Sequence, residues 1–249
     1  MKLTYYGTAA AEGWPAPFCS CDHCERARLA GGRNIRTRSQ ALIDDSLLID
    51  FPADTYHHVL TYGLDLRRVR NIIFTHAHED HLYPEDLWIT TPPYAYDTKH
   101  EVIPVIHAWG NERVYERRQT RSDRVIFHVI NPFEALTLDQ YTVTPLLADH
   151  AKNQTCLIYL IESDGKSVLY ANDTGYFPDA TWDYLSNRAS NGLKLNFASL
   201  DTTCGTETGA RRNHMGYACG IEVKERLINM GVADTNTGFC FHHFSHNGG

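Results

Sequence analysis

The sequence contains no run of about eighteen apolar residues, the length that a membrane-spanning helix needs. Its first residues, MKLTYYGTAAAEGW, lack the positively charged segment followed by an apolar stretch that is typical of a secretory signal peptide. The simplest expectation is therefore a cytoplasmic protein whose thiols stay reduced. The seven cysteines are an odd number, so a framework of disulfides is not expected.

The chain also lacks an excess of positive charge, low-complexity segments, internal repeats and an interdomain linker. It carries 23 Lys and Arg against 30 Asp and Glu, and this net charge of −7 disfavours nucleic-acid binding because it repels phosphate backbones. Hydrophobic residues make up 43% of the 249, enough for a globular fold with a real core. We therefore expect one domain over residues 1–249.

Short apolar segments typical of β-strands recur along the chain, and segments with helical spacing lie between them. Strands are expected within residues 2–6, 39–51 (as a hairpin), 69–76, 101–108, 124–130, 141–148, 155–162, 167–173, 195–201 and 237–244. Helices are expected at 53–63, 179–189 and 215–231. This order predicts an α/β (α+β) fold in which two sheets pack face to face with helices outside.

Histidine is abundant, with fourteen residues, and the densest group follows an apolar segment. The stretch FTHAHEDH contains His76, His78, Asp80 and His81 directly after NIIF. Alternation at a strand end would point His76 and His78 the same way, and a tight turn would bring the other two nearby. Buried imidazoles and carboxylates each need a partner, and a metal ion supplies several at once. The pattern thus favours a metal site over a solvated polar loop.

The pattern HxHxDH after a strand resembles that of the metallo-β-lactamase fold superfamily, and the rest of that motif set occurs in order. Asp50 of LLIDF matches the aspartate that orients the histidines. His150 of PLLADH and Asp173 of LYANDTG match two further ligands. The last ligand corresponds to His243 of FCFHHFSH, or alternatively to His242, and alternation and a serine two residues later favour His243. The resemblance implies a four-layer αββα sandwich.

The same resemblance implies two divalent metal ions at the active site. One would be held by His76, His78 and His150, the other by Asp80, His81 and His243, and Asp173 would bridge them. Two cations roughly 3.5–4 Å apart can share a hydroxide of lowered pKa that acts as the nucleophile, and they offset charge in the transition state. Asp50 and Asp80 would then take part in catalysis. Such ligands accept Zn²⁺, Mn²⁺ or Fe²⁺.

A second candidate metal site lies in PFCSCDHCERAR, which holds three cysteines: Cys19, Cys21 and Cys24. A tetrahedral zinc needs one more ligand, and His246 supplies it if the C-terminal loop folds back. His23 competes for this place, although adjacent backbone would be strained. The closed site would be a structural zinc in an N-terminal loop at about 17–28. Three free thiols are the alternative; a thioredoxin-like role is disfavoured because no CxxC is expected to open a helix in a βαβ unit.

The cysteine loop, the HxHxDH core and the terminal HHFSH together resemble the phosphonate-pathway cyclic phosphodiesterases (the PhnP-like family), and the PqqB proteins share the cysteine loop. This resemblance implies hydrolysis of a small cyclic phosphate such as phosphoribosyl 1,2-cyclic phosphate. His214 of RRNHMG matches the family's general acid, which protonates the leaving alkoxide. A helix-capping Asn213 beside an incidental histidine is the alternative. Family members usually continue past His246, and a further segment there could close the site or support a homodimer.

Other functions on the same fold stay open. A thioesterase of the glyoxalase type would carry a glycine-framed histidine motif at the third ligand, which LLADHAKNQ lacks. A tRNA 3′-processing nuclease would need an RNA-gripping arm and a basic surface. A non-catalytic PqqB-like binding or carrier protein would be expected to have lost ligands, because an intact set without ions is costly to keep in one pocket.

Basic residues near these motifs could bind an anionic substrate. Arg211 and Arg212 precede His214, and five more lie in or after the cysteine stretch: Arg26, Arg28, Arg33, Arg36 and Arg38. The alternative is a solvated basic loop. The expected partner is thus a small anionic phosphate ester, with no membrane and no nucleic acid.

Overall fold

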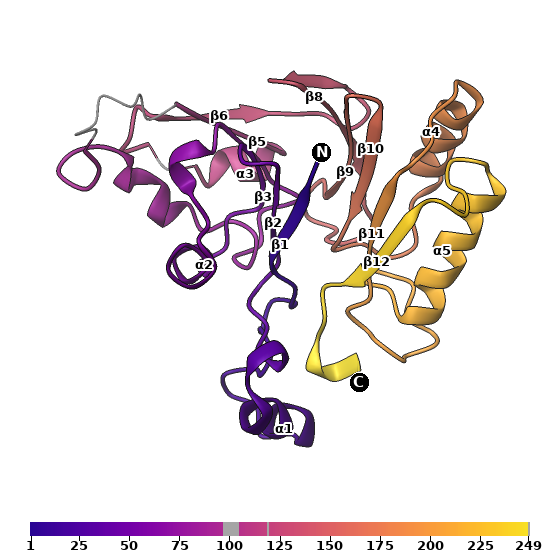
Figure 1. The fold of residues 1–249 in the computed structure, drawn as a ribbon, viewed down its shortest axis with the longest axis horizontal. Helices are drawn as coiled ribbons and strands as arrows, with labels where there is room; N and C mark the ends of the chain where they lie inside the picture. Colours follow the sequence, from indigo (N-terminus) through magenta and orange to yellow (C-terminus); the bar gives the residue numbers. More distant parts are fainter. Residues whose placement is uncertain (97–104, 119, 249) are drawn as a thin grey trace.

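The computed structural model describes residues 1–96, 105–118 and 120–248, which form two six-stranded sheets facing each other (Figure 1). The first sheet contains, in spatial order, β1 (Leu3–Gly7), β2 (Gln40–Ile43), β3 (Leu47–Ile49), β4 (Asn71–Ile73), β5 (Ile106–Gly110) and β6 (Val125–Val129). The second contains β12 (Gly238–His242), β11 (Phe197–Asp201), β10 (Lys166–Ala171), β9 (Leu157–Ser163), β8 (Tyr141–Leu147) and β7 (Leu136–Leu138).

Helices cover the outer sides of both sheets, apart from the first helix, which lies at one end of the molecule beside the C-terminal segment (Figure 1). They are α1 (Asp22–Ala30), α2 (Thr55–Tyr62), α3 (Glu112–Glu116), α4 (Asp179–Ser190) and α5 (Tyr217–Asn229), with short 3₁₀ turns η1 (Gly32–Asn34), η2 (Leu66–Arg68), η3 (Pro84–Thr90) and η4 (His246–Gly248). In the described part of the chain, no helix combines the length and the apolar composition that crossing a membrane requires.

Three buried apolar clusters hold these layers together. One lies between the sheets, one between the first sheet and its outer cover, and one between the second sheet and α4 and α5. Central strands are buried on both faces, so Leu47, Leu48 and Ile49 of β3 are all inaccessible to solvent. This explains why the sequence shows continuous apolar runs here rather than alternation. The predicted four-layer α/β fold is confirmed.

Strand direction determines where the polar landmarks meet. β3, β4 and β5 run parallel, as do β10, β11 and β12. β8 is antiparallel to β9, which is antiparallel to β10, so β8 runs in the direction of β10. Loops that follow parallel strands converge at one edge of their sheet, and this edge is where ligands bind in open α/β sheets. The predicted ligands outside the cysteine stretch and its partner His246 lie in such loops.

Several short elements differ from the expectation. The cysteine stretch is a loop only as far as Cys21, which caps α1, so a CxxC does open a helix here. The neighbouring strands β1 and β2 are antiparallel, however, so the unit is not βαβ. β7 and α3 were not predicted, because three and five residues show too little periodicity. Residues 101–104 of the strand expected at 101–108 lie outside the described residues.

Buried His58 on α2 makes the stability of the fold depend on pH. Its Nδ1 lies 2.6 Å from Gln40 Oε1 and its Nε2 lies 2.7 Å from the Thr37 hydroxyl, which fits a neutral ring. Burial, with a smaller contribution from His57, lowers the pKa of His58 from 6.5 to about 4. The unfolded chain therefore binds a proton here at a higher pH than the folded chain does.

This contribution to stability is complete above pH 6.5 and is lost as the pH falls toward 4. We expect the loss to reach about 3 kcal/mol. Urea unfolding of the wild type and of His58→Gln, at several pH values across this window, measures it. The variant cannot titrate at this position and should show a flatter dependence. If the free energy of unfolding changed with pH equally in the two proteins, the prediction would be wrong.

Candidate metal centre

Three of the predicted site residues occupy strained positions just beyond strand ends. Asp50 follows β3 with a φ of 63°, Asp173 follows β10 with a φ of 55°, and His243 follows β12 with a φ of 69°. Residues other than glycine adopt this left-handed region at a cost, and such positions cluster at functional sites. The turn there directs each side chain into the space between the strand ends.

The first candidate site is formed by His76, His78 and His150. His76 Nε2 lies 2.8 Å and His150 Nε2 lies 3.2 Å from the same atom, His78 Nδ1. These histidines converge from loops, because β4 ends at Ile73 and not at His76 as expected. Their convergence therefore does not come from strand alternation.

Hydrogen bonds determine which nitrogens of this triad carry protons. The Thr75 hydroxyl donates to Asp50, so it accepts from His76 Nδ1 at 3.0 Å. The carbonyl oxygen of Asn213 can only accept, so His150 Nδ1 donates to it at 3.0 Å. The two Nε2 atoms then present lone pairs to His78 Nδ1, which has at most one proton to offer. A cation at the centre would satisfy all three nitrogens.

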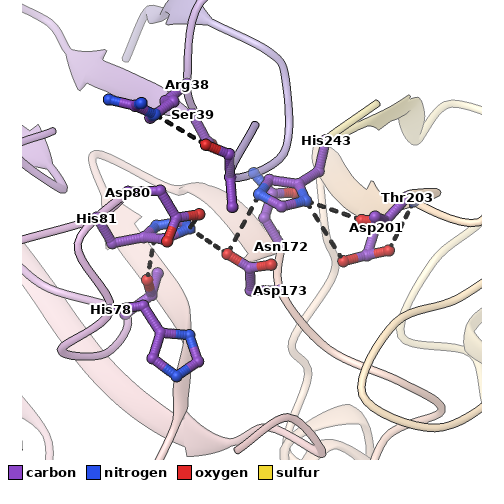
Figure 2. Close-up of polar contacts among 12 residues, drawn as sticks. Arg38, Ser39, His78, Asp80, His81, Asn172, Asp173, Asp201, Thr203 and His243 are labelled. Carbon is purple, nitrogen blue, oxygen red and sulfur yellow. Dashed lines mark hydrogen bonds and ion pairs between the residues drawn. The ribbon is translucent and has the colours of Figure 1, made fainter. Parts of the chain in front are cut away.

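The second candidate site is formed by Asp80, His81, Asp173 and His243, which converge in Figure 2. His81 Nε2 contacts Asp173 Oδ2 and lies 3.1 Å from Asp80 Oδ2, and His243 Nε2 lies 3.2 Å from Asp173 Oδ2. His81 Nε2, Asp173 Oδ2 and His243 Nε2 are buried without a hydrogen-bond partner among the described residues. Only positive charge between them, a proton or a metal cation, satisfies these atoms.

Further polar groups hold the far side of these imidazoles. Asp50 Oδ2 accepts from His81 Nδ1 at 2.7 Å, as the sequence predicted for an orienting aspartate. Asp50 is itself held by the Thr75 amide at 2.8 Å. The Thr203 hydroxyl lies 2.8 Å from His243 Nδ1. Histidines that bind metals usually make such a second hydrogen bond, which fixes the ring and its tautomer.

The charges at this edge depend on one another. Burial lowers the pKa of His81, but the carboxylates of Asp173, Asp80 and Asp50 outweigh burial and raise it well above the usual value. Burial would raise the pKa of Asp173, but His243 and His81 hold it well below the usual range. Burial, reinforced by His81, lowers the pKa of His76. Without a cation, the ionised carboxylates therefore favour the protonated form of His81. A divalent cation in the place of that proton would leave neutral nitrogen ligands beside ionised carboxylates, the donor set that divalent cations prefer.

His214 lies beside these two groups. Its ring stacks on that of His243 with centroids 5.7 Å apart, and its Nδ1 lies 3.4 Å from Asp173 Oδ1. Asp201 Oδ2 accepts from Nδ1 at 3.0 Å, so Nε2 is the nitrogen left to exchange a proton. Burial lowers the pKa of His214, but Asp201 outweighs burial and raises it to about 9. The alternative of a capping Asn213 is wrong, because Gly216 caps α5.

Asp201 is a site residue that the sequence reasoning missed. It belongs to a further group with Asp173, His214 and His243 whose ligand atoms lie within 4.8 Å of one another. Asp201 Oδ1 accepts from the amides of Thr203 and Met215, and its Oδ2 accepts from His214, so both oxygens already have partners. It therefore positions His214 and needs no cation. Its signal was an aspartate at the end of the apolar segment LNFASLD, like those after β3 and β10.

The cysteines and His246 also come together: Cys19, Cys21, Cys24 and His246 place their ligand atoms within 4.8 Å of one another. His246 Nδ1 lies 3.4 Å from Cys21 Sγ and 3.6 Å from Cys19 Sγ. Zn–S bonds of ~2.3 Å and Zn–N bonds of ~2.0 Å at a tetrahedral angle separate sulfur from nitrogen by ~3.5 Å. The four side chains thus fit a closed tetrahedral zinc site.

Local structure shifts the pKa values of these cysteines and fixes the segment that carries His246. The amide of Cys24, with Cys19 and His246, lowers the pKa of the Cys21 thiol to about 6, whereas burial raises that of Cys24 to about 11. The C-terminal segment that carries His246 is docked closely on Gly205. This residue has a φ of 47°, and a Cβ there would lie 1.7 Å from the Gly248 oxygen.

The competing ligands of the sequence analysis lie elsewhere. His23 Nδ1 accepts from Arg26 at 3.1 Å and does not belong to the cysteine cluster. His242, the last residue of β12, contacts Asn172 and packs against the Tyr5 ring, with centroids 4.6 Å apart. His243 faces Asp173 as expected, although alternation does not explain it, because the strand has already ended.

Comparisons with known proteins agree with this architecture. A family model described as "Beta-lactamase superfamily domain" matches residues 47–227. No curated protein matches the chain in sequence.

Solved structures share the fold at low identity. A diphosphatase from the PhnP family has a TM-score of 0.70 at 20% identity, over 98% of this chain and 86% of that one. Zn²⁺-bound PqqB from Methylobacterium extorquens has a TM-score of 0.64 at 17% identity, over 98% and 89%. The short form of human tRNase Z has a TM-score of 0.63 at 13% identity, over 99% and 93%. Identities this low establish the common fold alone.

Proposed function

Because this chain belongs to the beta-lactamase superfamily domain family, as its HxHxDH pattern predicted, we propose that it is a metal-dependent phosphodiesterase acting on a small cyclic phosphate or phosphodiester. The observation that carries the proposal is the convergence of unsatisfied nitrogen and carboxylate atoms beside a histidine whose Nδ1 is held by a buried carboxylate. The first part suits metal cations, and the second suits proton donation to a leaving group.

The residues present fit two divalent cations. His76, His78 and His150 would hold one, and Asp80, His81 and His243 the other, with Asp173 between them. When bound, such cations lower the pKa of water to near neutrality and offset charge on the reacting phosphoryl group. Zn²⁺, Mn²⁺ and Fe²⁺ all suit these ligands.

Residues around the metal ligands would orient those ligands and supply a proton to the leaving group. Asp50 accepts from Nδ1 of His81 and so fixes its tautomer, and Thr203 orients the ring of His243, so the site is organised before substrate arrives. Asp201 fixes His214 so that its Nε2 can pass a proton to the leaving oxygen. The remaining side of His214 is partly open, with 26% of its side chain exposed, which leaves room for a substrate to reach it.

Of the two arginines before His214, the structure leaves only one available. Arg211 contacts Glu222, and its guanidinium carbon lies 4.3 Å over the Tyr176 ring. The side chain of Arg212 is 76% exposed, and its Nε lies 3.9 Å from Asp149. Arg212 is therefore the residue of this pair that would contact an anionic substrate.

Phosphorus esters are favoured over thioesters by two considerations. One structural neighbour is named a diphosphatase and another a tRNase Z. The arrangement of a protonated histidine beside the candidate metal ligands suits a poor alkoxide leaving group, which thioesters do not have. A non-catalytic carrier related to PqqB is the second candidate, and its zinc-bound structure shares the fold.

A substrate screen tests the proposal. Protein reconstituted with Zn²⁺, Mn²⁺ or Fe²⁺ would be incubated with small cyclic phosphates, nucleotide diesters and thioesters. We expect hydrolysis of the phosphate compounds, with cyclic phosphates preferred. Turnover of thioesters alone would overturn the proposal, and an absence of turnover with any substrate by fully loaded protein would favour the carrier.

Metal content provides a separate prediction. Protein purified without chelator should contain about three metal ions per chain, one of them zinc in the thiolate site. Cys21→Ser should contain about one fewer and lose protection of residues 12–38 from proteolysis, because the closed site fastens this segment to the C-terminus. Cys240→Ser removes a thiol outside the cluster and should keep all three. The prediction fails if Cys21→Ser retains its full metal content.

A further inference from the structure

The five arginines of residues 26–38 do not form a uniform basic loop. Arg28 pairs with Glu25 at 2.7 Å and also donates to the Ala16 carbonyl. Arg38 lies 3.3 Å from Asp54. In the part of the chain that the structure describes, Arg26 and Arg36 make no ion pair with a carboxylate. Among the described residues, no carboxylate therefore neutralises their positive charges.

Arg26 and Arg36 line the same pocket. It has a volume of about 490 Å³ and lies where α1 and the following turn meet the segment after β12; its other lining side chains include Trp14, His23, Asn34 and Phe244. No carboxylate belongs to the lining that the structure describes. Figure 1 shows α1 and the C-terminal segment side by side at one end of the molecule. The volume is within the range of small-molecule sites.

The two guanidinium groups are oriented by neutral partners. Arg36 donates to the Thr8 hydroxyl at 2.9 Å, and its guanidinium carbon lies 4.5 Å from the centre of the Phe244 ring. Arg26 donates to His23 Nδ1 at 3.1 Å, so that ring is neutral at this nitrogen. Neutral partners leave each guanidinium with its full charge, and planar guanidinium groups bind phosphate through paired hydrogen bonds.

We propose that this pocket binds a phosphorylated ligand that carries a planar ring, such as a nucleotide. Arg26 and Arg36 would contact the phosphate, and the aromatic walls supplied by Trp14 and Phe244 would contact the ring. In a chain of net charge −7, a pocket whose described lining has two positive charges and no acid is a local exception that favours anions. The proposal does not depend on the function of the metal centre.

Titration with AMP tests this site in the metal-loaded protein, with the fluorescence of Trp14 as readout. The contribution of Trp14 is the AMP-dependent change in fluorescence that the wild type shows and Trp14→Phe lacks. We expect Arg26→Gln and Arg36→Gln each to weaken AMP binding at least about tenfold. Arg33→Gln is the matched control, because Arg33 is an exposed arginine of the same segment that does not line the pocket. It should bind AMP as the wild type does.

Two further binding measurements extend the test. One distinguishes binding at this pocket from binding at the metal centre, and the other distinguishes the contribution of the phosphate from that of the ring. Asp173→Asn should keep the Trp14-dependent binding even if it loses all hydrolysis. Ribose 5-phosphate, which lacks a planar ring, should bind more weakly than AMP. Equal AMP affinity in Arg26→Gln and wild type would overturn the proposal, and because Arg26 is exposed this variant is not expected to unfold. Equal affinity for AMP and ribose 5-phosphate would overturn the assignment of the rings.

Discussion

Replacing Asp173 by Asn is expected to lower hydrolysis at least about a thousandfold while leaving the fold intact. Asp173 is the carboxylate at the centre of the second group, in contact with His81 and 3.2 Å from His243 Nε2. An amide of the same shape removes the negative charge that would attract and hold cations. The protein should also retain fewer metal ions after dialysis, since a neutral amide is a much weaker ligand than a carboxylate.

The same geometry argues that the variant will fold. Asp173 lies beyond the end of β10 in a left-handed conformation, and asparagine tolerates that region as well as aspartate does. Asp183→Asn makes the same chemical change at an exposed position of α4 and should alter neither rate nor metal content. The measurements are kcat on the best substrate of the screen, metal content and thermal unfolding. If Asp173→Asn kept its metal ions and a rate within tenfold of wild type, Asp173 would not be a ligand.

The sequence was sufficient to predict the layered fold and to identify which side chains would meet. The reason lies in the strands: each predicted ligand of the active site follows an apolar segment, and parallel strands bring their carboxyl ends to one edge. The order of elements along the chain therefore predicts proximity without any knowledge of distances. His76 and His150 are 74 positions apart, yet both lie within hydrogen-bonding distance of His78.

What the sequence could not predict are the contacts that hold these side chains. Thr75 and Thr203 are small hydroxyl residues with no pattern of their own, and their partners become apparent only when the loops are placed. Asp201 was visible as an aspartate at a strand end, but no motif marked it. His243, and not His242, faces Asp173, but strand alternation is not the reason. His243 lies just beyond β12 with a left-handed backbone, and this turn directs its ring to Asp173.

The start of α1 is another place where the sequence predicted which side chains meet but not the local structure around them. The spacing of three cysteines predicts that they converge, but not that Cys21 ends a loop and caps a helix. The helix matters for chemistry, because an amide at its first turn stabilises the thiolate of Cys21. It also places Arg26, two residues after Cys24, in the lining of the pocket described above and not in a loose basic loop.

His214→Ala is expected to lower the hydrolysis of an alkyl phosphodiester by about 10²–10⁴-fold and that of a p-nitrophenyl ester far less. An alkoxide leaves only when it receives a proton, whereas p-nitrophenolate leaves without one. His214 Nε2 can supply that proton because Asp201 holds Nδ1 at 3.0 Å and keeps the ring protonated, with a pKa raised to about 9 after the opposing effect of burial. The measurement is the ratio of kcat on the two substrates in wild type and variant.

Asp201→Asn separates proton donation from a merely structural role, since it keeps the histidine but removes the charge that raises its pKa. A general acid must carry its proton, so the rate on the alkyl substrate falls as the pH rises through the pKa of His214. This descending limb should lie at a lower pH in Asp201→Asn than in wild type. A cation held by Asp173 would repel the imidazolium and move both descending limbs to lower pH. The limb of Asp201→Asn would still lie at a lower pH than that of wild type. Equal losses of His214→Ala on the two substrates, or identical limbs in wild type and Asp201→Asn, would each contradict the assignment of His214 as the proton donor.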